Sequence, residues 1–206
     1  MKNTGNDAKR ISAQITTEAQ MHKHAIILCI NDLRLAFEYV EPHDDNVDVF
    51  SHRFYELLLR GCTEFESLCK TLLKKSGISF SDDGNIKDYF HLTELINQLR
   101  LSGMIVKRWN PYPRAWFPFA DWNDQNTGPS WYRAYNRVKH SRREEFPKAN
   151  LQNTILAISA CVALLCEAYG DNFLSSSPQV HVYADENGSV VVYDELDLGY
   201  AKKVSP

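Results

Sequence analysis

Residues 151–169 read Leu-Gln-Asn-Thr-Ile-Leu-Ala-Ile-Ser-Ala-Cys-Val-Ala-Leu-Leu-Cys-Glu-Ala-Tyr, a helical segment that is apolar on most of its sides. A helix of this kind is stable in water only when other elements surround it, so we expect it at the centre of a helical bundle. Its longest apolar stretch, Ile155 to Leu165, is too short to cross a bilayer. Gly170 predicts the point where the helix ends. The segment therefore favours a soluble protein with no membrane association.

Further helical patterns precede this central segment. Apolar residues recur at steps of three and four along each of them, which is typical of helices with one buried face. The last of them starts at Gly128-Pro129-Ser130, with Pro129 in the first turn and Ser130 as the capping oxygen. Together they predict an all-α fold, a four- to five-helix up-and-down bundle, whose earlier helices span Lys9–Val40, Phe50–Gly77, Lys87–Leu101 and Ser130–Glu145.

Two segments depart from the helical period. Residues 103–128 hold three prolines and six aromatic residues, which predict an ordered loop or short strands inserted before the fourth helix. These aromatics either cap the end of the bundle or serve function or oligomer contacts. Asn187-Gly188 between valine-rich runs predicts a β-hairpin over 179–194, followed by a flexible tail over 200–206. We therefore expect a bundle over 1–175 and an accessory hairpin and tail over 176–206.

The cysteine count and the first residues favour the cytoplasm. Five cysteines form no CxxC pair, and each falls in a helical pattern, which predicts reduced thiols in the core. Residues 1–10 are polar and do not resemble a secretory signal. We expect no metal and no cofactor, because no Cys/His cluster has the spacing of metal ligands.

Charge is unevenly distributed along the chain. The net charge is -3, yet the segment from Lys107 to Arg143 carries eight basic residues against two acidic ones. A basic segment in an otherwise acidic protein predicts contact with phosphate at one place.

Four polar residues of this basic segment fall on one helical face. On a wheel of about 100° per residue with Arg133 at 0°, His140 lies near about -20°, Asn136 near about -60° and Arg137 near about +40°. An imidazole can move a proton near neutral pH, a guanidinium can stabilise charge developing on phosphorus, and an amide can orient either group. The face therefore predicts metal-independent cleavage of RNA through its 2'-hydroxyl, close to a helix N-terminus that favours anions. We expect Arg133, Asn136 and His140 to be catalytic, and Arg137, Lys139 and Arg142 to bind substrate phosphates.

This segment resembles the motif of the HEPN superfamily, in which an Arg and a His are separated by a short spacer at the start of a bundle helix. Residues 135–142, Tyr-Asn-Arg-Val-Lys-His-Ser-Arg, look like the bacterial members, and the similarity extends over about residues 20–170, including Glu64 and Glu66. The resemblance implies a cytoplasmic bacterial ribonuclease that acts on RNA as a homodimer with a composite site. It also implies a role in a toxin-antitoxin pair, phage defence or RNA processing, with an antitoxin or other protein partner.

Two departures from the family pattern keep alternatives open. Ala134 stands where active members often carry a polar residue, and the six residues between Arg133 and His140 form the longest spacer that the pattern allows. Either Arg133 or Arg137 is thus the functional arginine. One alternative is a non-catalytic HEPN-like module that binds a nucleotide, an RNA or a protein. Another is a structural helical protein whose aromatic loop is an interaction surface. For Trp131, Tyr132 and Tyr135 we expect packing rather than stacking on bases, and the basic residues could instead form a solvated helix face.

Overall fold

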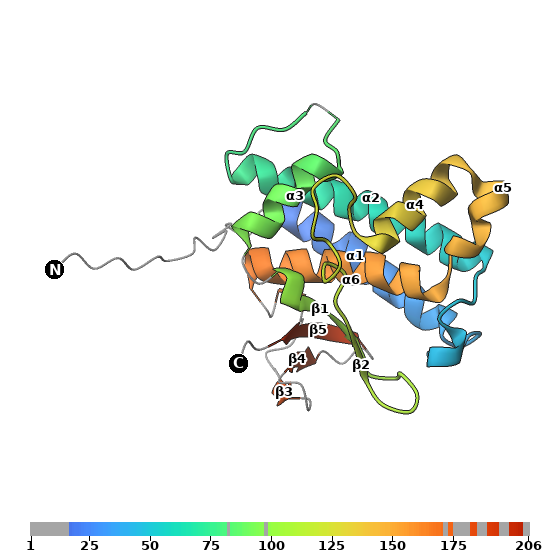
Figure 1. Cartoon of the computed structure of the whole chain (residues 1–206). Coiled ribbons are helices and arrows are strands. Elements are labelled where there is room, and N and C mark those ends of the chain that lie inside the picture. The colour runs from blue at the N-terminus through green and yellow to red at the C-terminus, as the bar shows by residue number, and fades with distance from the viewer. Residues whose placement is uncertain are drawn as a thin grey trace.

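The computed structural model describes residues 17–81, 83–96, 99–170, 173–174, 182–184, 189–193 and 198–203. Within these ranges the chain is mainly helical and adds one antiparallel sheet (Figure 1). The α-helices are α1 (Thr17–Ala36), α2 (His52–Lys75), α3 (Ile86–Leu95), α4 (Ser130–His140), α5 (Arg142–Glu145) and α6 (Leu151–Tyr169). Three 3-10 turns accompany them: Asp44–Asn46, Leu99–Leu101 and Phe146–Lys148.

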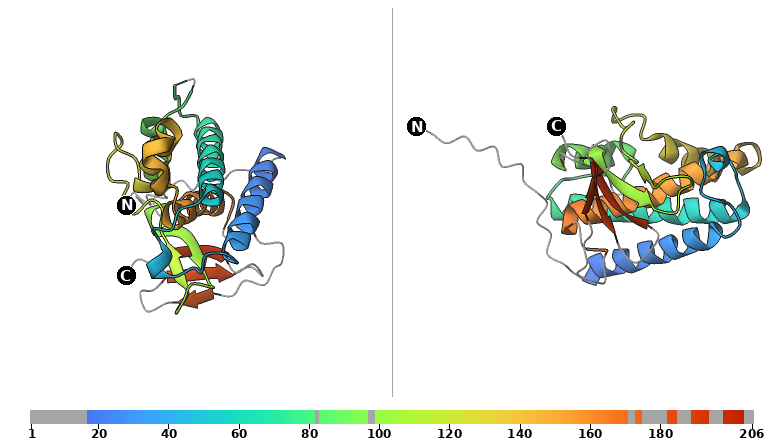
Figure 2. Two further views of the ribbon diagram at one scale, coloured as in Figure 1. Left: turned by 90° about the vertical axis from the view of Figure 1, so that its right-hand side faces the viewer. Right: turned by 90° about the horizontal axis from the view of Figure 1, so that it is seen from below.

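The central helix α6 has the bounds that the sequence predicts. The side chain of Asn150 caps it by accepting the backbone N–H of Asn153, and α1, α2, α4 and the sheet surround it (Figures 1 and 2). It is long and apolar enough to cross a membrane, but 78% of its most apolar window is buried inside the protein. The prediction of a core helix is confirmed.

The other predicted helices are present with shifted ends. Helix α2 begins one residue after Ser51, whose hydroxyl accepts the N–H of Phe54, and it matches its prediction closely. Helix α1 ends earlier than predicted, because the chain turns after Ala36, and residues 9–16 of its prediction lie outside the described residues. Helix α3 also ends early, at Leu95.

The predicted helix over 130–145 is two helices. Ser141, with φ −136° and ψ 53°, leaves the helical conformation and separates α4 from α5. The start of α4 also differs from prediction, because Pro129 is the N-cap residue and makes no side-chain cap. The carboxylate of Asp121 takes that role instead and accepts the N–H of Ser130 at 2.9 Å. The prediction of Ser130 as the capping oxygen was therefore wrong.

The sheet is larger than the predicted hairpin. Its order is β2-β1-β5-β4-β3, all antiparallel. The strands are β1 (Ser102–Val106), β2 (Arg114–Trp116), β3 (Val182–Ala184), β4 (Ser189–Tyr193) and β5 (Leu198–Lys203). Strands β1 and β2 confirm the short strands predicted in the insertion, and β3 with β4 confirms the hairpin.

Strand β5 corrects the expected tail. Residues 200–203, predicted to be a flexible tail, belong to β5, and 204–206 lie outside the described residues. The physical reason is that β2 covers only one edge of β1. The other edge of β1 pairs with β5, from Ser102↔Lys202 to Val106↔Leu198, and this pairing satisfies the backbone hydrogen bonds of both strands. The sheet thus joins strands from both predicted units, and the boundary at 175/176 stays a prediction.

Most aromatic residues of the insertion are part of the core. Trp116, Phe119 and Trp122 are buried, while Tyr112 is 77% exposed. Gly103 lets β1 approach β2, since a Cβ there would lie 1.9 Å from the carbonyl oxygen of Trp116. Packing therefore accounts for most of the insertion's aromatic content.

Candidate active site

Helix α4 has a buried face and an exposed face. Trp131, Tyr132, Ala134, Tyr135 and Val138 are buried. Arg133, Arg137 and His140 are exposed, and Asn136 is half-buried. The predicted catalytic residues thus lie away from the core, where a ligand in solution can reach them.

The buried face fixes the helix through specific contacts. Trp131 packs edge-on against Phe65, with ring centroids 5.0 Å apart, and its indole N–H donates to the carbonyl oxygen of Pro118 at 2.8 Å. The hydroxyl of Tyr132 donates to Glu66 Oε1 at 2.7 Å. Burial, and secondly this bond to a carboxylate, raises the pKa of Tyr132 well above its usual range. The prediction that these aromatics pack is confirmed.

Arg133 is turned toward the start of its own helix. Its Nη1 donates to the carbonyl oxygen of Gly128 at 2.5 Å, which uses one of its five N–H groups. The anion-binding position at this helix start is occupied by the Asp121 carboxylate. A substrate phosphate would therefore meet the guanidinium rather than the free end of the helix.

His140 and Arg137 differ in their surroundings. His140 is the last residue of α4, and its side chain forms no hydrogen bond or ion pair with the part of the chain that the structure describes. Arg137 faces α5: the pKa of Glu145 is lowered chiefly by its hydrogen bond from Lys148, and the charge of Arg137 contributes to the lowering. The imidazole is thus free to meet a ligand, and the exposed face continues from α4 onto α5.

Lys139 and Arg142 do not share this face. The ammonium of Lys139 donates to the hydroxyl of Tyr135 at 3.2 Å, which raises the pKa of Lys139. Arg142 lies over the ring of Tyr55, 4.2 Å from its centroid, and contacts His52 Nδ1 at 3.0 Å. The break at Ser141 separates Arg142 from α4, and phosphate binding by Lys139 and Arg142 stays a prediction.

The basic segment is also divided in space. Arg108 lies 3.9 Å from a carboxylate oxygen of Glu41. Arg114 pairs with Asp44, which also accepts the indole N–H of Trp109 at 3.0 Å. These two arginines are thus neutralised by an acidic segment that is distant in the sequence. The positive charge that remains exposed is concentrated on α4 and α5.

Buried thiols and one buried histidine complete the polar groups of the core. The five cysteines are free and buried, as predicted, and burial raises the pKa of Cys62, Cys69 and Cys161 well above the usual value. His22 is only 6% exposed and lies between Glu64 and Thr71, at 3.5 Å and 3.2 Å. Nothing in the local sequence of His22 signals these partners, because both come from α2. Among the described residues, no group of three His, Cys, Asp or Glu could hold a metal ion.

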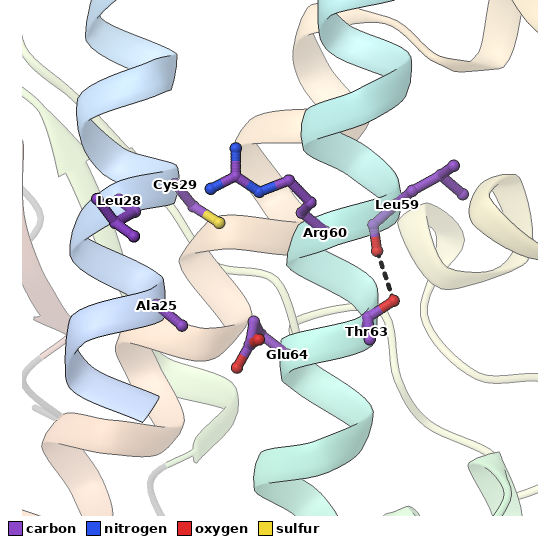
Figure 3. A pocket seen from close by; sticks show the side chains of 7 residues that line it. All are labelled: Ala25, Leu28, Cys29, Leu59, Arg60, Thr63 and Glu64. Carbon is purple, nitrogen blue, oxygen red and sulfur yellow. Dashed lines mark hydrogen bonds between the residues drawn. The ribbon is translucent and has the colours of Figure 1, made fainter. Parts of the chain in front are cut away.

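A shallow groove of about 270 Å³ lies between α1 and α2 (Figure 3). It is lined by Ala25, Leu28, Cys29, Leu59, Arg60, Thr63 and Glu64. The guanidinium of Arg60 is bound to Asp32, and no residue of α4 takes part. The groove is therefore separate from the exposed face of α4.

Comparisons with protein-family models, curated proteins and solved structures find no match to this chain. The resemblance to the HEPN superfamily thus rests on the motif in α4. The function has to be argued from the residues and their geometry.

Proposed function

We propose that this chain is a metal-independent endoribonuclease of the HEPN type. One observation carries the proposal: α4 exposes Arg133, Arg137 and His140 on one side while its opposite side is locked into the core. A guanidinium and an imidazole on one rigid helix are groups that can carry out RNA cleavage through the 2'-hydroxyl.

The chemistry follows from these groups. The 2'-oxygen attacks phosphorus while an imidazole accepts its proton, and the bond from phosphorus to the 5'-oxygen breaks, leaving a cyclic phosphate. The leaving 5'-oxygen takes a proton from a second imidazole in its protonated form. Arg133 stabilises the charge on the phosphoryl oxygens, and Asn136 orients the reacting groups.

A homodimer supplies the second imidazole. With one His140 in each chain, two α4 faces brought together provide one neutral imidazole and one imidazolium, and Arg137 holds a neighbouring phosphate. The proposal includes a bacterial cytoplasmic role in RNA processing, phage defence or a toxin-antitoxin pair with a protein partner.

The direct test compares the wild-type protein with His140→Ala on single-stranded RNAs in the presence of EDTA. We expect a cyclic phosphate product from the wild type and a loss of about 10²- to 10⁴-fold in rate for the variant. His24→Ala is the matched control, because His24 is exposed on α1. Equal cleavage by His140→Ala, or no cleavage of varied RNAs by the wild type, would count against the proposal.

A second candidate is a non-catalytic module that binds RNA or a nucleotide. Two observations favour it: Ala134, beside the motif arginine, is buried and apolar, and Arg133 is bonded to a backbone carbonyl. Binding that survives His140→Ala, weakens with Arg137→Ala and falls steeply with salt, without cleavage, would support this candidate over the nuclease.

A further inference from the structure

An aromatic cluster lies where α2 begins and α5 ends, and we name it the ring patch: Phe50, His52, Tyr55, Arg142 and Phe146. The ring of Phe146 is its centre, with centroid distances of 4.9 Å to His52, 5.7 Å to Phe50 and 6.0 Å to Tyr55. Phe50 is 47% exposed, although its side chain is wholly apolar. The patch therefore presents an aromatic ring to solvent.

Arg142 gives the ring patch a fixed positive charge. Its guanidinium lies 4.2 Å from the ring centroid of Tyr55 and 5.7 Å from that of Phe146. It also contacts His52 Nδ1 at 3.0 Å, and because arginine has only donors, Nδ1 must accept. The ring proton of His52 is then on Nε2, so the exposed imidazole has a donor on its other nitrogen.

The ring patch follows α4 along the chain, beyond the break at Ser141. Arg142 follows His140 by two residues. The charge of Arg137 contributes to lowering the pKa of Glu145, the residue of α5 that precedes Phe146. Residues 137–148 carry five basic side chains against two acidic ones. Of the carboxylates within two residues of a patch residue in the sequence, Glu145 is bonded to Lys148 and Asp48 accepts from Asn150, whereas Glu56 and Glu144 are exposed. Aromatic rings and positive charge thus lie side by side, in a patch whose Arg142 follows the proposed catalytic His140 by two residues.

We propose that the ring patch is a stacking platform for single-stranded RNA, on which an unpaired base beside the cleaved phosphate stacks. This inference rests on the proposed function and adds a base-binding site to it. Bases stack on aromatic rings and guanidinium planes only when they are free of a duplex, and the positive charge attracts the flanking phosphates. A second copy of the chain fits less well, because the patch offers one exposed phenylalanine amid charged groups rather than a broad apolar area.

The test measures binding in the His140→Ala background, so that the RNA stays intact. Fluorescence anisotropy with a labelled single-stranded oligonucleotide, and with its duplex, compares Phe50→Ala, Phe50→Trp and Tyr112→Ala. We expect Phe50→Ala to bind the single strand about tenfold more weakly with little change for the duplex, and Phe50→Trp to keep the affinity. Tyr112→Ala is the matched control, because Tyr112 is an exposed aromatic residue outside the ring patch.

The outcomes separate this inference from the proposed function. If Phe50→Ala binds like Tyr112→Ala, or no variant binds the single strand, the platform is overturned even when the wild type cleaves RNA. If Phe50→Ala weakens binding but the wild type never cleaves, the platform stands and the nuclease proposal fails. A change of oligomeric state in Phe50→Ala, measured by light scattering, would make the ring patch a subunit contact and overturn the inference.

Discussion

The two faces of α4 are made by the same eleven residues but hold different kinds of contact. On the buried face, Trp131 and Tyr132 have their polar atoms bonded and their rings enclosed by α2 and the insertion. On the exposed face, Arg133 is bonded to a carbonyl, and His140 has no partner among the described residues. The comparison teaches that substitutions on the two faces should affect different properties, stability on one and ligand chemistry on the other.

The largest expected effect tests the buried face. Trp131→Ala removes a fully buried indole and leaves the carbonyl of Pro118 without its donor, so we expect the free energy of unfolding to fall by about 3–5 kcal/mol. Chemical denaturation measures the change, with Arg137→Ala as the exposed-face control. A loss below about 1 kcal/mol would mean that the buried face does not hold the helix in place.

A smaller effect comes from pH. Burial raises the pKa of Cys62 on α2, so the folded protein keeps this proton when the unfolded chain has lost it. The stabilisation is fully present below about pH 8.5 and is lost as pH rises toward the folded-state value, at about 1.4 kcal/mol per pH unit for each such thiol. Denaturation at pH 8 and above, under reducing conditions, measures this slope.

Two variants test whether the buried thiols cause this dependence of the free energy of unfolding on pH. Cys62→Ala should be less stable at neutral pH but lose less stability on further alkalinisation, while His140→Ala keeps the wild-type slope. A wild-type free energy of unfolding that stays flat above pH 9 would contradict the enclosure of these thiols.

The smallest expected effect on stability is on the exposed face. Arg133→Ala should lower the free energy of unfolding by no more than about 1 kcal/mol, because the side chain is exposed and loses one hydrogen bond, to the carbonyl of Gly128. RNA cleavage should nevertheless fall by about 10²-fold. Arg137→Ala, measured in parallel, decides which arginine is functional: a larger rate loss for Arg137→Ala would reverse the assignment.

Local sequence patterns predicted the elements whose buried and exposed sides follow from their own residues. The apolar sides of α6 and the three- and four-residue steps of α2 gave their bounds, and the helical wheel placed Arg133, Arg137 and His140 on one exposed side. These features depend on periodicity alone.

Features that depend on distant partners were not predicted. The cap on α4 comes from Asp121, the charge of Arg114 is neutralised by Asp44, and Arg142 lies over a ring of α2. Each contact joins residues that only the folded chain brings together: Asp121 reaches Ser130 across a turn of the insertion, and the other two pairs lie far apart in the sequence. The division of the basic segment follows from the same cause.

The pairing of β1 with β5 has a consequence for synthesis on the ribosome. All six described α-helices precede β5 in the chain, so a nascent protein can complete them while β1 still has one bare edge. An uncovered strand edge is a template for association with other chains. Until Leu198–Lys203 emerges, the growing polypeptide is therefore most exposed to misassembly at Ser102–Val106.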